Sequence, residues 1–286
     1  MNMLEVEAIV RRALAEDVGT GDITTTLTIS PQSKSKARIV AREDGIIAGL
    51  PIAALVFSLA AESYGTEGGQ AGSLVFIPSV ADGDPAARGD SVAEIEGLTR
   101  VILTGERTAL NILQRLSGIA SSTAQLVSLV QHTKARIVDT RKTTPGLRIL
   151  EKYAVRCGGG GNHRFGLYDA ILIKDNHVQA AGGIAPAIER ARAAAPHTIK
   201  IEIEADTLDQ VEQALGAGAD MILLDNMTVS TIREAVVLCA GRAITEASGG
   251  ITKATIAAIA ETGVDLISVG ALTHSVRALD LSLEVM

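Results

Sequence analysis

Aromatic residues and cysteine are scarce in this sequence of 286 residues. It has no Trp, three Phe and three Tyr, and its two cysteines, Cys157 and Cys239, stand far apart. Proteins that bind single-stranded nucleic acid commonly stack bases on aromatic side chains, so the composition disfavours that class. Two distant cysteines exclude a disulfide framework and a Cys-x-x-Cys metal site, and they are typical of a reducing, cytoplasmic compartment.

A surplus of basic residues and long apolar runs are also lacking. Lys and Arg total 26 against 33 Asp and Glu, which gives a formal net charge of −7 and a pI of about 5.3. This balance argues against a nucleic-acid partner, because such binding depends on basic contacts to phosphate. No run reaches the roughly 18 apolar residues of a membrane helix, and charges interrupt residues 1–17, so we expect no signal peptide and no membrane partner.

Apolar and charged residues are otherwise present in ordinary proportions, at 47% and 21% of the chain. The length accommodates one large domain or two, with a core of Ala, Val, Ile and Leu. In the N-terminal part, periodicity predicts helices over 4–16, 51–62 and 98–131, the last with a break near Ser117 and Gly118, and strands over 38–42, 45–50, 74–77 and 91–95.

After that region, short apolar runs alternate with helical segments, which is typical of a parallel sheet covered by helices. We therefore predict a mixed α/β sandwich domain over 1–117, a parallel domain over 118–272 and a C-terminal segment, 273–286, that returns to the first domain. The predicted strands of the parallel domain are 136–140, 170–175, 199–204, 221–225, 243–247 and 266–270, and its predicted helices are 147–155, 184–195, 208–215, 229–239 and 253–261.

Nearly every predicted strand of the parallel domain ends in polar residues. In an open doubly wound sheet the ligand groups gather at one switch point, whereas in a closed barrel every strand end faces the same mouth. Polar endings throughout therefore favour an irregular α/β barrel of about six strands. The strand-end residues are Asp139, Lys174, Asp175, Asn176, Glu202, Glu204, Asp225, Asn226, Glu246, Ser248 and Ser268.

Basic residues gather at this predicted mouth of an acidic protein. They are Arg141, Lys142, His163, Arg164 and Lys174. Scattered surface charges would explain one of them, but the group points to an anionic substrate held in a partly desolvated pocket. The planar fork of arginine suits carboxylates and phosphates.

Glycines stand beside several of these residues. The run Gly158–Gly161 precedes His163, and it reads either as a flexible connector or as a binding loop. Ser248, Gly249 and Gly250 come between a predicted strand and a helix expected from about Thr252, where backbone N–H groups can hold phosphate. Gly270 and Ala271 close the next strand in the same way, and plain strand-to-helix turns are the alternative for both segments.

Glu204 and Asp225 end consecutive predicted strands, so we expect their carboxylates to be neighbours. Paired carboxylates facing a phosphorylated substrate suit Mg²⁺, bound directly or through water. They can also stabilise a positively charged transition state. Capping of the following helices is the structural alternative.

Taken together, the motifs resemble the quinolinate phosphoribosyltransferase family over essentially the whole chain. The resemblance implies phosphoribosyl transfer from phosphoribosyl pyrophosphate (PRPP) to the ring nitrogen of quinolinate, with loss of CO₂ and formation of nicotinate mononucleotide in NAD biosynthesis. It also implies Mg²⁺ and a homodimer, or a larger assembly, with shared active sites. The segments that carry it are 16–17, 21–25, 105–111, 140–143, 158–164, 174–177, 224–226, 246–251 and 269–274.

The same resemblance implies roles for individual residues. Quinolinate would be held by Arg107 of a partner subunit and by Thr140, Arg141, His163, Arg164 and Lys174. Catalysis, PRPP and metal would involve Lys142, Glu204 and Asp225, and the phosphate would lie at Ser248, Gly249, Gly250, Gly270 and Ala271.

Three alternatives remain open from the sequence. A related phosphoribosyltransferase could act on another acceptor. An aldolase could form a Schiff base on Lys174, for which that lysine would need a depressed pKa. A non-catalytic phosphoribosyl-binding regulator is disfavoured because Glu204 and Asp225 are both present.

Overall fold

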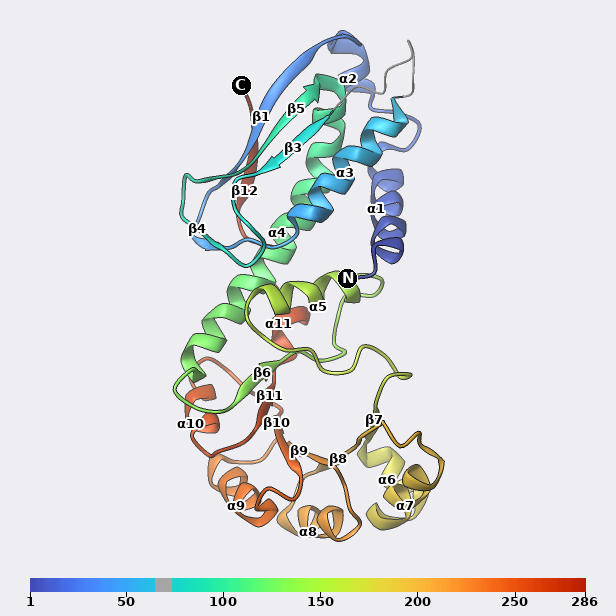
Figure 1. Cartoon of the computed structure of the whole chain (residues 1–286), viewed down its shortest axis with the longest axis vertical. Helices are drawn as coiled ribbons and strands as arrows, with labels where there is room; N and C mark the ends of the chain where they lie inside the picture. Colours follow the sequence, from blue (N-terminus) through green and yellow to red (C-terminus); the bar gives the residue numbers. More distant parts are fainter. Residues whose placement is uncertain (65–73) are drawn as a thin grey trace. The chain divides into compact units, whose positions relative to one another are not determined.

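The computed structural model describes residues 1–64 and 74–286 (Figure 1). The chain forms two compact units. The first unit comprises Met1–Ala124, Thr144–Gly159 and Ser275–Met286, and the second comprises Gln125–Thr143 and Gly160–His274. The first unit therefore includes residues 144–159, which sequence periodicity assigns to the parallel domain.

An antiparallel sheet organises the first unit, with strand order β12-β1-β5-β3. Its outer strand β12 (Leu281–Val285) comes from the end of the chain and pairs with β1 (Lys34–Ala41), so that Ala41 lies opposite Leu281. In Figure 1 this C-terminal strand lies beside the blue strand β1. The alternation of apolar and polar residues in β12 fits such a pairing, because one face of the strand is buried.

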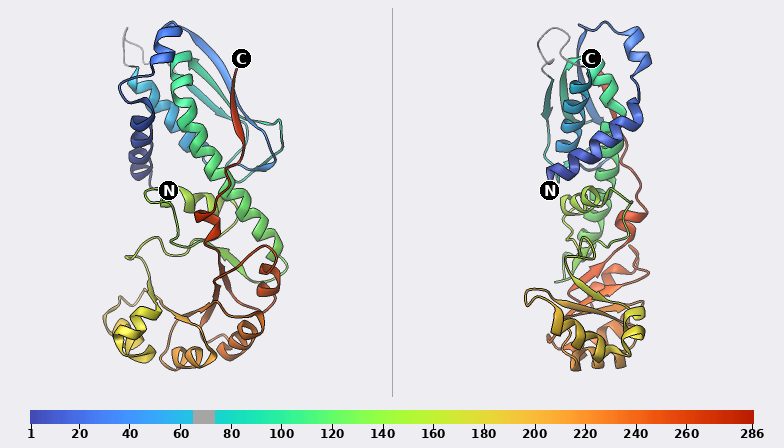
Figure 2. Two further views of the ribbon diagram at one scale, coloured as in Figure 1. Left: turned by 180° about the vertical axis from the view of Figure 1, so that it is seen from behind. Right: turned by 90° about the vertical axis from the view of Figure 1, so that its right-hand side faces the viewer.

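Helices pack against this sheet in the views of Figure 2. Phe57 of α3 (Leu50–Ser63) stacks on Phe76 of β3, with 6.1 Å between the ring centroids. Gly105 of α4 (Thr99–Val130) leaves room for the same ring, since a Cβ there would lie 2.7 Å from Phe57. A core with few aromatic residues thus uses one ring to join a strand and two helices.

The long helix α4 runs without the break expected at Ser117 and Gly118, so that prediction is wrong. Ser117 is buried and its hydroxyl accepts a 3.0 Å hydrogen bond from the backbone N–H of Ala48. A Cβ on Gly118 would lie 2.1 Å from the carbonyl oxygen of Arg277. Both residues are small because other segments approach the helix closely, which is not a reason for the helix to end.

The remaining elements of the first unit are short or terminal. They are α1 (Met3–Val18), α2 (Ile23–Thr28), β2 (Gly45–Ile46), β3 (Val75–Pro78), β4 (Pro85–Ala86), β5 (Ser91–Leu98) and α5 (Arg148–Cys157).

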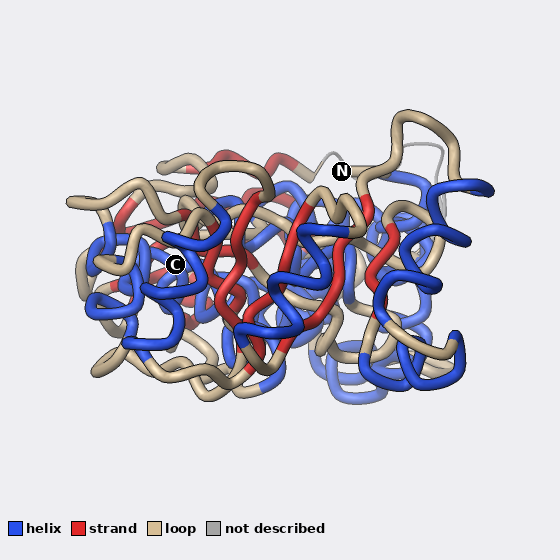
Figure 3. The backbone as a smooth tube through the Cα atoms, turned by 90° about the horizontal axis from the view of Figure 1, so that it is seen from below, coloured by secondary structure: helices blue, strands red, loops and turns tan. Residues whose placement is uncertain are grey.

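A parallel sheet of six strands organises the second unit, in the order β6-β11-β10-β9-β8-β7. Helices α7 to α10 flank it on its outer side (Figure 1), and Figure 3 shows helices alongside strands in the view from below. The strands read as runs of Ile, Val and Leu because both faces are covered. The elements are β6 (Arg136–Val138), β7 (Ile171–Ile173), α6 (Asp175–Ala181), α7 (Ile184–Ala194), β8 (Ile201–Ala205), α8 (Leu208–Gly216), β9 (Met221–Asp225), α9 (Val229–Cys239), β10 (Ile244–Ser248), α10 (Ile256–Ala260), β11 (Leu266–Ser268) and α11 (Ala271–His274).

This sheet is an irregular barrel that is not closed by a pairing of β6 with β7 within the described residues. Instead, Gly161 forms a parallel bridge to Val138 of β6. A Cβ on Gly161 would lie 3.2 Å from the Val138 side chain, so glycine allows this close approach. All six strands still direct their carboxyl ends to one side, which places the polar residues that follow them together.

Candidate active site

A cavity of about 710 Å³ lies at the carboxyl ends of the six parallel strands. Every residue that lines it belongs to the second unit. The lining is predominantly polar, as expected for a site that binds a charged ligand. The lining residues are Thr140, Arg141, Lys142, His163, Arg164, Leu172, Lys174, Asp175, Glu204, Asp206, Leu223, Asp225, Asn226, Glu246, Ser248, Gly249, Gly250 and Ser268.

Most residues selected from the sequence meet in this cavity. Thr140 to Lys142, both members of the His163–Arg164 pair, Lys174, Glu204, Asp225 and the segment 248–250 all line it. Among the described residues Gly270, Ala271 and Arg107 do not. Arg107 is exposed on α4, in the first unit.

The two arginines that line the cavity are close enough for their charges to interact. Burial and, second, the neighbouring Arg141 guanidinium lower the pKa of Arg164. Arg164 donates a 3.2 Å hydrogen bond from Nη1 to the carbonyl of Ala170, and its buried Nε has no hydrogen-bond partner among the described residues. An anion between the two guanidiniums would relieve their repulsion and satisfy this donor.

Lys174 pairs with Glu204 at the edge of the cavity. Their side chains are 45% and 15% exposed, respectively. The Lys174 amine is therefore engaged by a carboxylate, whereas a Schiff-base lysine must have its amine available to the substrate. The pairing therefore favours a binding role for Lys174 over an aldolase mechanism.

The segment that carries Arg141 and Lys142 is held by hydroxyl groups. The Thr140 hydroxyl accepts a 3.0 Å hydrogen bond from the Lys142 N–H, and the Thr273 hydroxyl donates a 2.8 Å bond to the Lys142 carbonyl. A Cβ on Gly270 would lie 3.1 Å from Cδ of Lys142. The structure thus gives Gly270 a steric relation to Lys142 instead of a place in the cavity lining.

The glycines after β10 allow a close approach to β9. Gly249 and Gly250 have φ values of +91° and +61°, and a Cβ on Gly249 would lie 2.1 Å from Oδ1 of Asn226. Asn226 donates a 2.9 Å backbone hydrogen bond to the Ser248 carbonyl. The helix expected from Thr252 begins at Ile256, so this prediction is wrong. Thr252 and Thr255 form a turn with local hydrogen bonds before the helix starts. The N–H groups of Gly249 and Gly250 therefore do not lie at the N-terminus of a helix.

Buried Asp139 fixes the loop that brings His163 and Arg164 to the cavity. Its carboxylate accepts hydrogen bonds of 2.6 Å from the Asn162 side chain and 2.9 Å from the His163 N–H. Gly161 donates a 2.8 Å backbone bond to Ile137. Here the end of the glycine run is bonded to a strand and does not act as a free connector.

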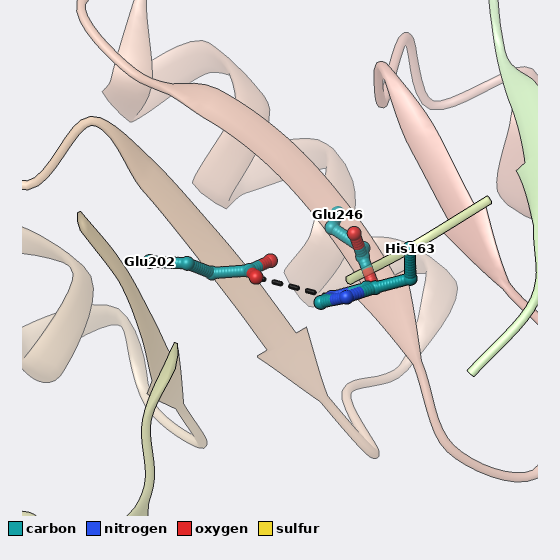
Figure 4. A group of neighbouring side chains, drawn as sticks. All are labelled: His163, Glu202 and Glu246. Carbon is teal, nitrogen blue, oxygen red and sulfur yellow. Dashed lines mark ion pairs between the residues drawn. The ribbon is translucent and has the colours of Figure 1, made fainter. Parts of the chain in front are cut away.

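Two acids beside His163 end predicted strands, and the sequence alone predicts no specific role for them. Figure 4 shows His163, Glu202 and Glu246 converging from a loop and two strands. The His163 Nε2 atom lies 3.1 Å from Oε2 of Glu202 and 3.7 Å from Oε1 of Glu246. The strand sequence Ile201-Glu202-Ile203-Glu204 indicates a place for Glu202 near the site, because residues two apart on a strand share a face and Glu204 is a predicted site residue.

Glu246 is the most buried acid of this group, with a side chain that is 1% exposed. Burial and, second, the charge of Glu202 raise the pKa of Glu246 to about 7, while His163 opposes the rise. Both carboxyl oxygens of Glu246 lack a hydrogen-bond partner among the described residues. Such a group in a cavity is available for proton transfer near neutral pH.

Comparison with known proteins places this chain in a family. A model of the quinolinate phosphoribosyl transferase C-terminal domain matches residues 119–284, and a model of the N-terminal domain matches residues 22–117. A probable nicotinate-nucleotide pyrophosphorylase [carboxylating] from Bacillus subtilis is 46% identical over 285 residues, which cover 100% of this chain and 95% of the relative.

Solved structures agree with the sequence relatives. The nicotinate-nucleotide pyrophosphorylase from Francisella tularensis superposes with a TM-score of 0.93 at 41% identity, covering 100% of this chain and 98% of that one. NadC from Streptococcus pyogenes has a TM-score of 0.92 at 42% identity, with the same coverage. The chain therefore belongs to the quinolinate phosphoribosyl transferase family.

Proposed function

We propose that this protein is a carboxylating nicotinate-nucleotide pyrophosphorylase. It transfers the phosphoribosyl group of PRPP to the ring nitrogen of quinolinate and releases CO₂, pyrophosphate and nicotinate mononucleotide, a step of NAD biosynthesis. The observation that carries this proposal is the convergence of Arg141, Arg164 and Lys174 in one cavity with Glu204 and Asp225. Both substrates are anions, and full-length relatives bear the corresponding names.

In this proposal, one set of cavity residues binds quinolinate and another stabilises the charges that develop as pyrophosphate leaves. Arg141, Arg164 and Lys174 hold the two carboxylates of quinolinate and direct its ring nitrogen toward the ribose, with Thr140 and His163 shaping that end. As pyrophosphate leaves, positive charge develops on the ribose, and Glu204 and Asp225 stabilise it. Lys142 stabilises the negative charge on the leaving group.

The PRPP 5′-phosphate lies at the loop after β10 in this proposal. The φ values of Gly249 and Gly250, +91° and +61°, expose backbone N–H groups that side chains would otherwise obstruct. Ser248 adds a hydroxyl donor. Gly270 and Ala271 do not line the cavity, and Gly270 contributes indirectly by leaving room for the Lys142 side chain, which does line it.

The donor set also fits Mg²⁺. Glu204 and Asp225 would hold it, directly or through water, since Mg²⁺ prefers carboxylate, water and phosphate oxygens. Bound there, it would offset the negative charge of the pyrophosphate group.

A second copy of the chain completes the site in this proposal. Arg107 is exposed on the first unit, and we assign it to the quinolinate site of a partner subunit. Exposed apolar side chains on α1 and α2 support a subunit interface: Leu4 is 82%, Ile23 72% and Leu27 79% exposed.

Free Cys157 and Cys239 support a reducing, cytoplasmic compartment.

Among the described residues, no helix is long and apolar enough to cross a membrane.

Product analysis tests the proposed activity. The purified chain is incubated with PRPP, Mg²⁺ and either quinolinate or nicotinate, and nucleotide products are separated chromatographically. We expect nicotinate mononucleotide from quinolinate and little product from nicotinate, because nicotinate offers one carboxylate to a site built for two. Product from nicotinate alone would indicate a related enzyme with a different acceptor.

A further inference from the structure

Glu246 is a buried acid for which the proposed phosphoribosyl transfer has no use. It lies in the middle of β10, it is fully buried, and it contributes to the cavity lining. Neither of its carboxyl oxygens has a hydrogen-bond partner among the described residues. A charged carboxylate that is buried without hydrogen bonds is costly, and the nearby charge of Glu202 adds to this cost, so the protonated form of Glu246 is favoured.

The second half of the proposed reaction needs a proton. After transfer, the bond between the ring carbon and the departing carboxylate breaks, and its electron pair stays on that carbon beside the positively charged ring nitrogen. The carbon must then take up a proton to give nicotinate mononucleotide. The positive ring supplies the electron sink, but it cannot supply this proton.

We propose that Glu246 donates this proton to the ring carbon as CO₂ leaves, with Glu202 and His163 as positioning residues. The inference rests on the proposed function. A carbon–hydrogen bond forms, the O–H bond of the Glu246 carboxyl breaks, and the carboxylate that remains regains a proton from water before the next turnover.

His163 is a less suitable donor because both of its ring nitrogens are engaged. Nδ1 accepts a 2.7 Å hydrogen bond from the Arg164 N–H, and Nε2 lies 3.1 Å from Glu202 (Figure 4). A ring held in this way orients Arg164 and leaves its Nε2 proton directed at Glu202. Glu246 lies further from this nitrogen, with 3.7 Å between Nε2 and its Oε1, and it contributes to the cavity lining.

The charges around Glu246 support a protonated acid in the unliganded site and a proton donor in the liganded one. Glu202 faces it from β8, and Glu204 lies two residues further along the same strand. Arg141, Arg164 and Lys174 line the same cavity, where the carboxylates of quinolinate would neutralise them. Substrate binding thus removes cationic groups that would favour the carboxylate form, which keeps Glu246 protonated until the carbanion forms.

Single-turnover measurements on Glu246→Gln test the proposal, with pyrophosphate and nicotinate mononucleotide quantified at each time. We expect pyrophosphate release within a few-fold of wild type. Formation of nicotinate mononucleotide should slow at least about 100-fold, the scale of lost general acid catalysis. Phosphoribosylated quinolinate with both carboxyls should accumulate, because CO₂ recombines with a carbanion that receives no proton.

Two further variants sharpen the result. Glu246→Asp keeps an acid and should recover part of the lost rate. Glu212→Gln makes the same chemical change on an exposed residue of α8 and should behave as wild type. A further test uses the wild-type chain and so does not depend on the folding of a variant. Its formation of nicotinate mononucleotide should slow relative to pyrophosphate release as pH rises through about 7.

Several outcomes would overturn the assignment of Glu246. These are wild-type product formation by Glu246→Gln, an equal loss of pyrophosphate release and product, or a ratio of the two wild-type steps that does not change with pH. A wild-type chain that forms no nicotinate mononucleotide would instead refute the proposed function itself, so the two failures are distinguishable.

Discussion

Single side chains determine which anion this cavity can hold. Arg141 and Arg164 both line the cavity, and burial and the charge of Arg141 lower the pKa of Arg164, so a bound anion would offset the repulsion between the two guanidiniums. The same cavity contains Glu204 and Asp225, which would repel that anion. The lining thus contains groups that favour an anion and groups that favour positive charge.

Replacement of Arg141 by Ala should weaken quinolinate binding. A charge-assisted hydrogen bond contributes about 1.5–3 kcal/mol, so we expect the KM for quinolinate to rise at least about 10-fold, with a smaller effect on the KM for PRPP. Steady-state kinetics with each substrate varied in turn measure this. Arg190→Ala, which changes an exposed residue of α7, is the control. Equal kinetics of the two variants would refute the role of Arg141.

The Glu246 carboxyl should also affect stability. Its pKa is about 7 in the folded chain against 4.5 for an ordinary Glu. Between these values the folded protein holds a proton that the unfolded chain has released, so the free energy of unfolding falls as pH rises through this window.

Glu246→Gln removes this proton linkage. Between pH 5 and pH 8 the free energy of unfolding of the wild type should therefore fall by about 1–3 kcal/mol more than that of the variant. Urea unfolding at both pH values measures the difference. Parallel pH dependence of the two proteins would show that Glu246 is not protonated in the folded state near neutral pH.

At the scale of elements, the loop after β10 depends on two glycines and on its contact with the end of β9. Gly249 combines a φ of +91° with a Cβ position 2.1 Å from Oδ1 of Asn226. Gly182, after α6, has a similar φ of +86° but nothing within 4 Å of its Cβ position. Alanine substitutions at Gly182 and Gly249 therefore distinguish the cost of backbone strain alone from the cost of strain combined with a steric clash.

We expect Gly182→Ala to lower the free energy of unfolding by about 1 kcal/mol through backbone strain, with little change in kinetics. Gly249→Ala should cost more and should raise the KM for PRPP, since Asn226 and the phosphate loop must move apart. Denaturant unfolding and PRPP-dependent kinetics of both variants test this. An unchanged KM in Gly249→Ala would contradict a phosphate site at this loop.

The order of strands and helices in the second unit could be predicted from sequence, because buried strands and amphipathic helices leave distinct periodicities. The predicted range 229–239 coincides with α9. Short elements such as α6 and α11 could not be predicted in this way, since they span too few residues to show a period. The break expected at Ser117 failed because small residues there serve close packing between distant segments.

The site could be predicted to a similar extent. Strand-end polarity identified Arg141, Lys174, Glu204 and Asp225 because parallel strands end on one side of a sheet. The role of Glu246 could not be predicted, since its importance lies in burial and in missing hydrogen bonds, which only three-dimensional packing defines.

The whole molecule consists of two units, and the cavity uses residues of only the second. A role for Arg107 at the active site therefore requires that the first unit of some chain supplies it. An assembly of identical chains with two-fold symmetry provides such sites in pairs.

Mixed assemblies test this arrangement. Arg107→Ala and Lys142→Ala should each be nearly inactive, and random mixing should restore about a quarter of wild-type activity, because half the dimers contain one intact site of two. Activity after co-refolding or subunit exchange, with mixed dimers confirmed by mass spectrometry, measures this. No recovery in confirmed mixed dimers would place Arg107 in its own chain's site or outside any site.

The most direct measurement follows quinolinate labelled with ¹³C in the carboxyl group next to the ring nitrogen, in the presence of PRPP and Mg²⁺. If the protein binds both carboxylates of quinolinate and the one next to the ring nitrogen is lost as CO₂, then labelled CO₂, pyrophosphate and unlabelled nicotinate mononucleotide should form in equal amounts. Pyrophosphate without labelled CO₂, or a nucleotide that keeps the label, would contradict the account.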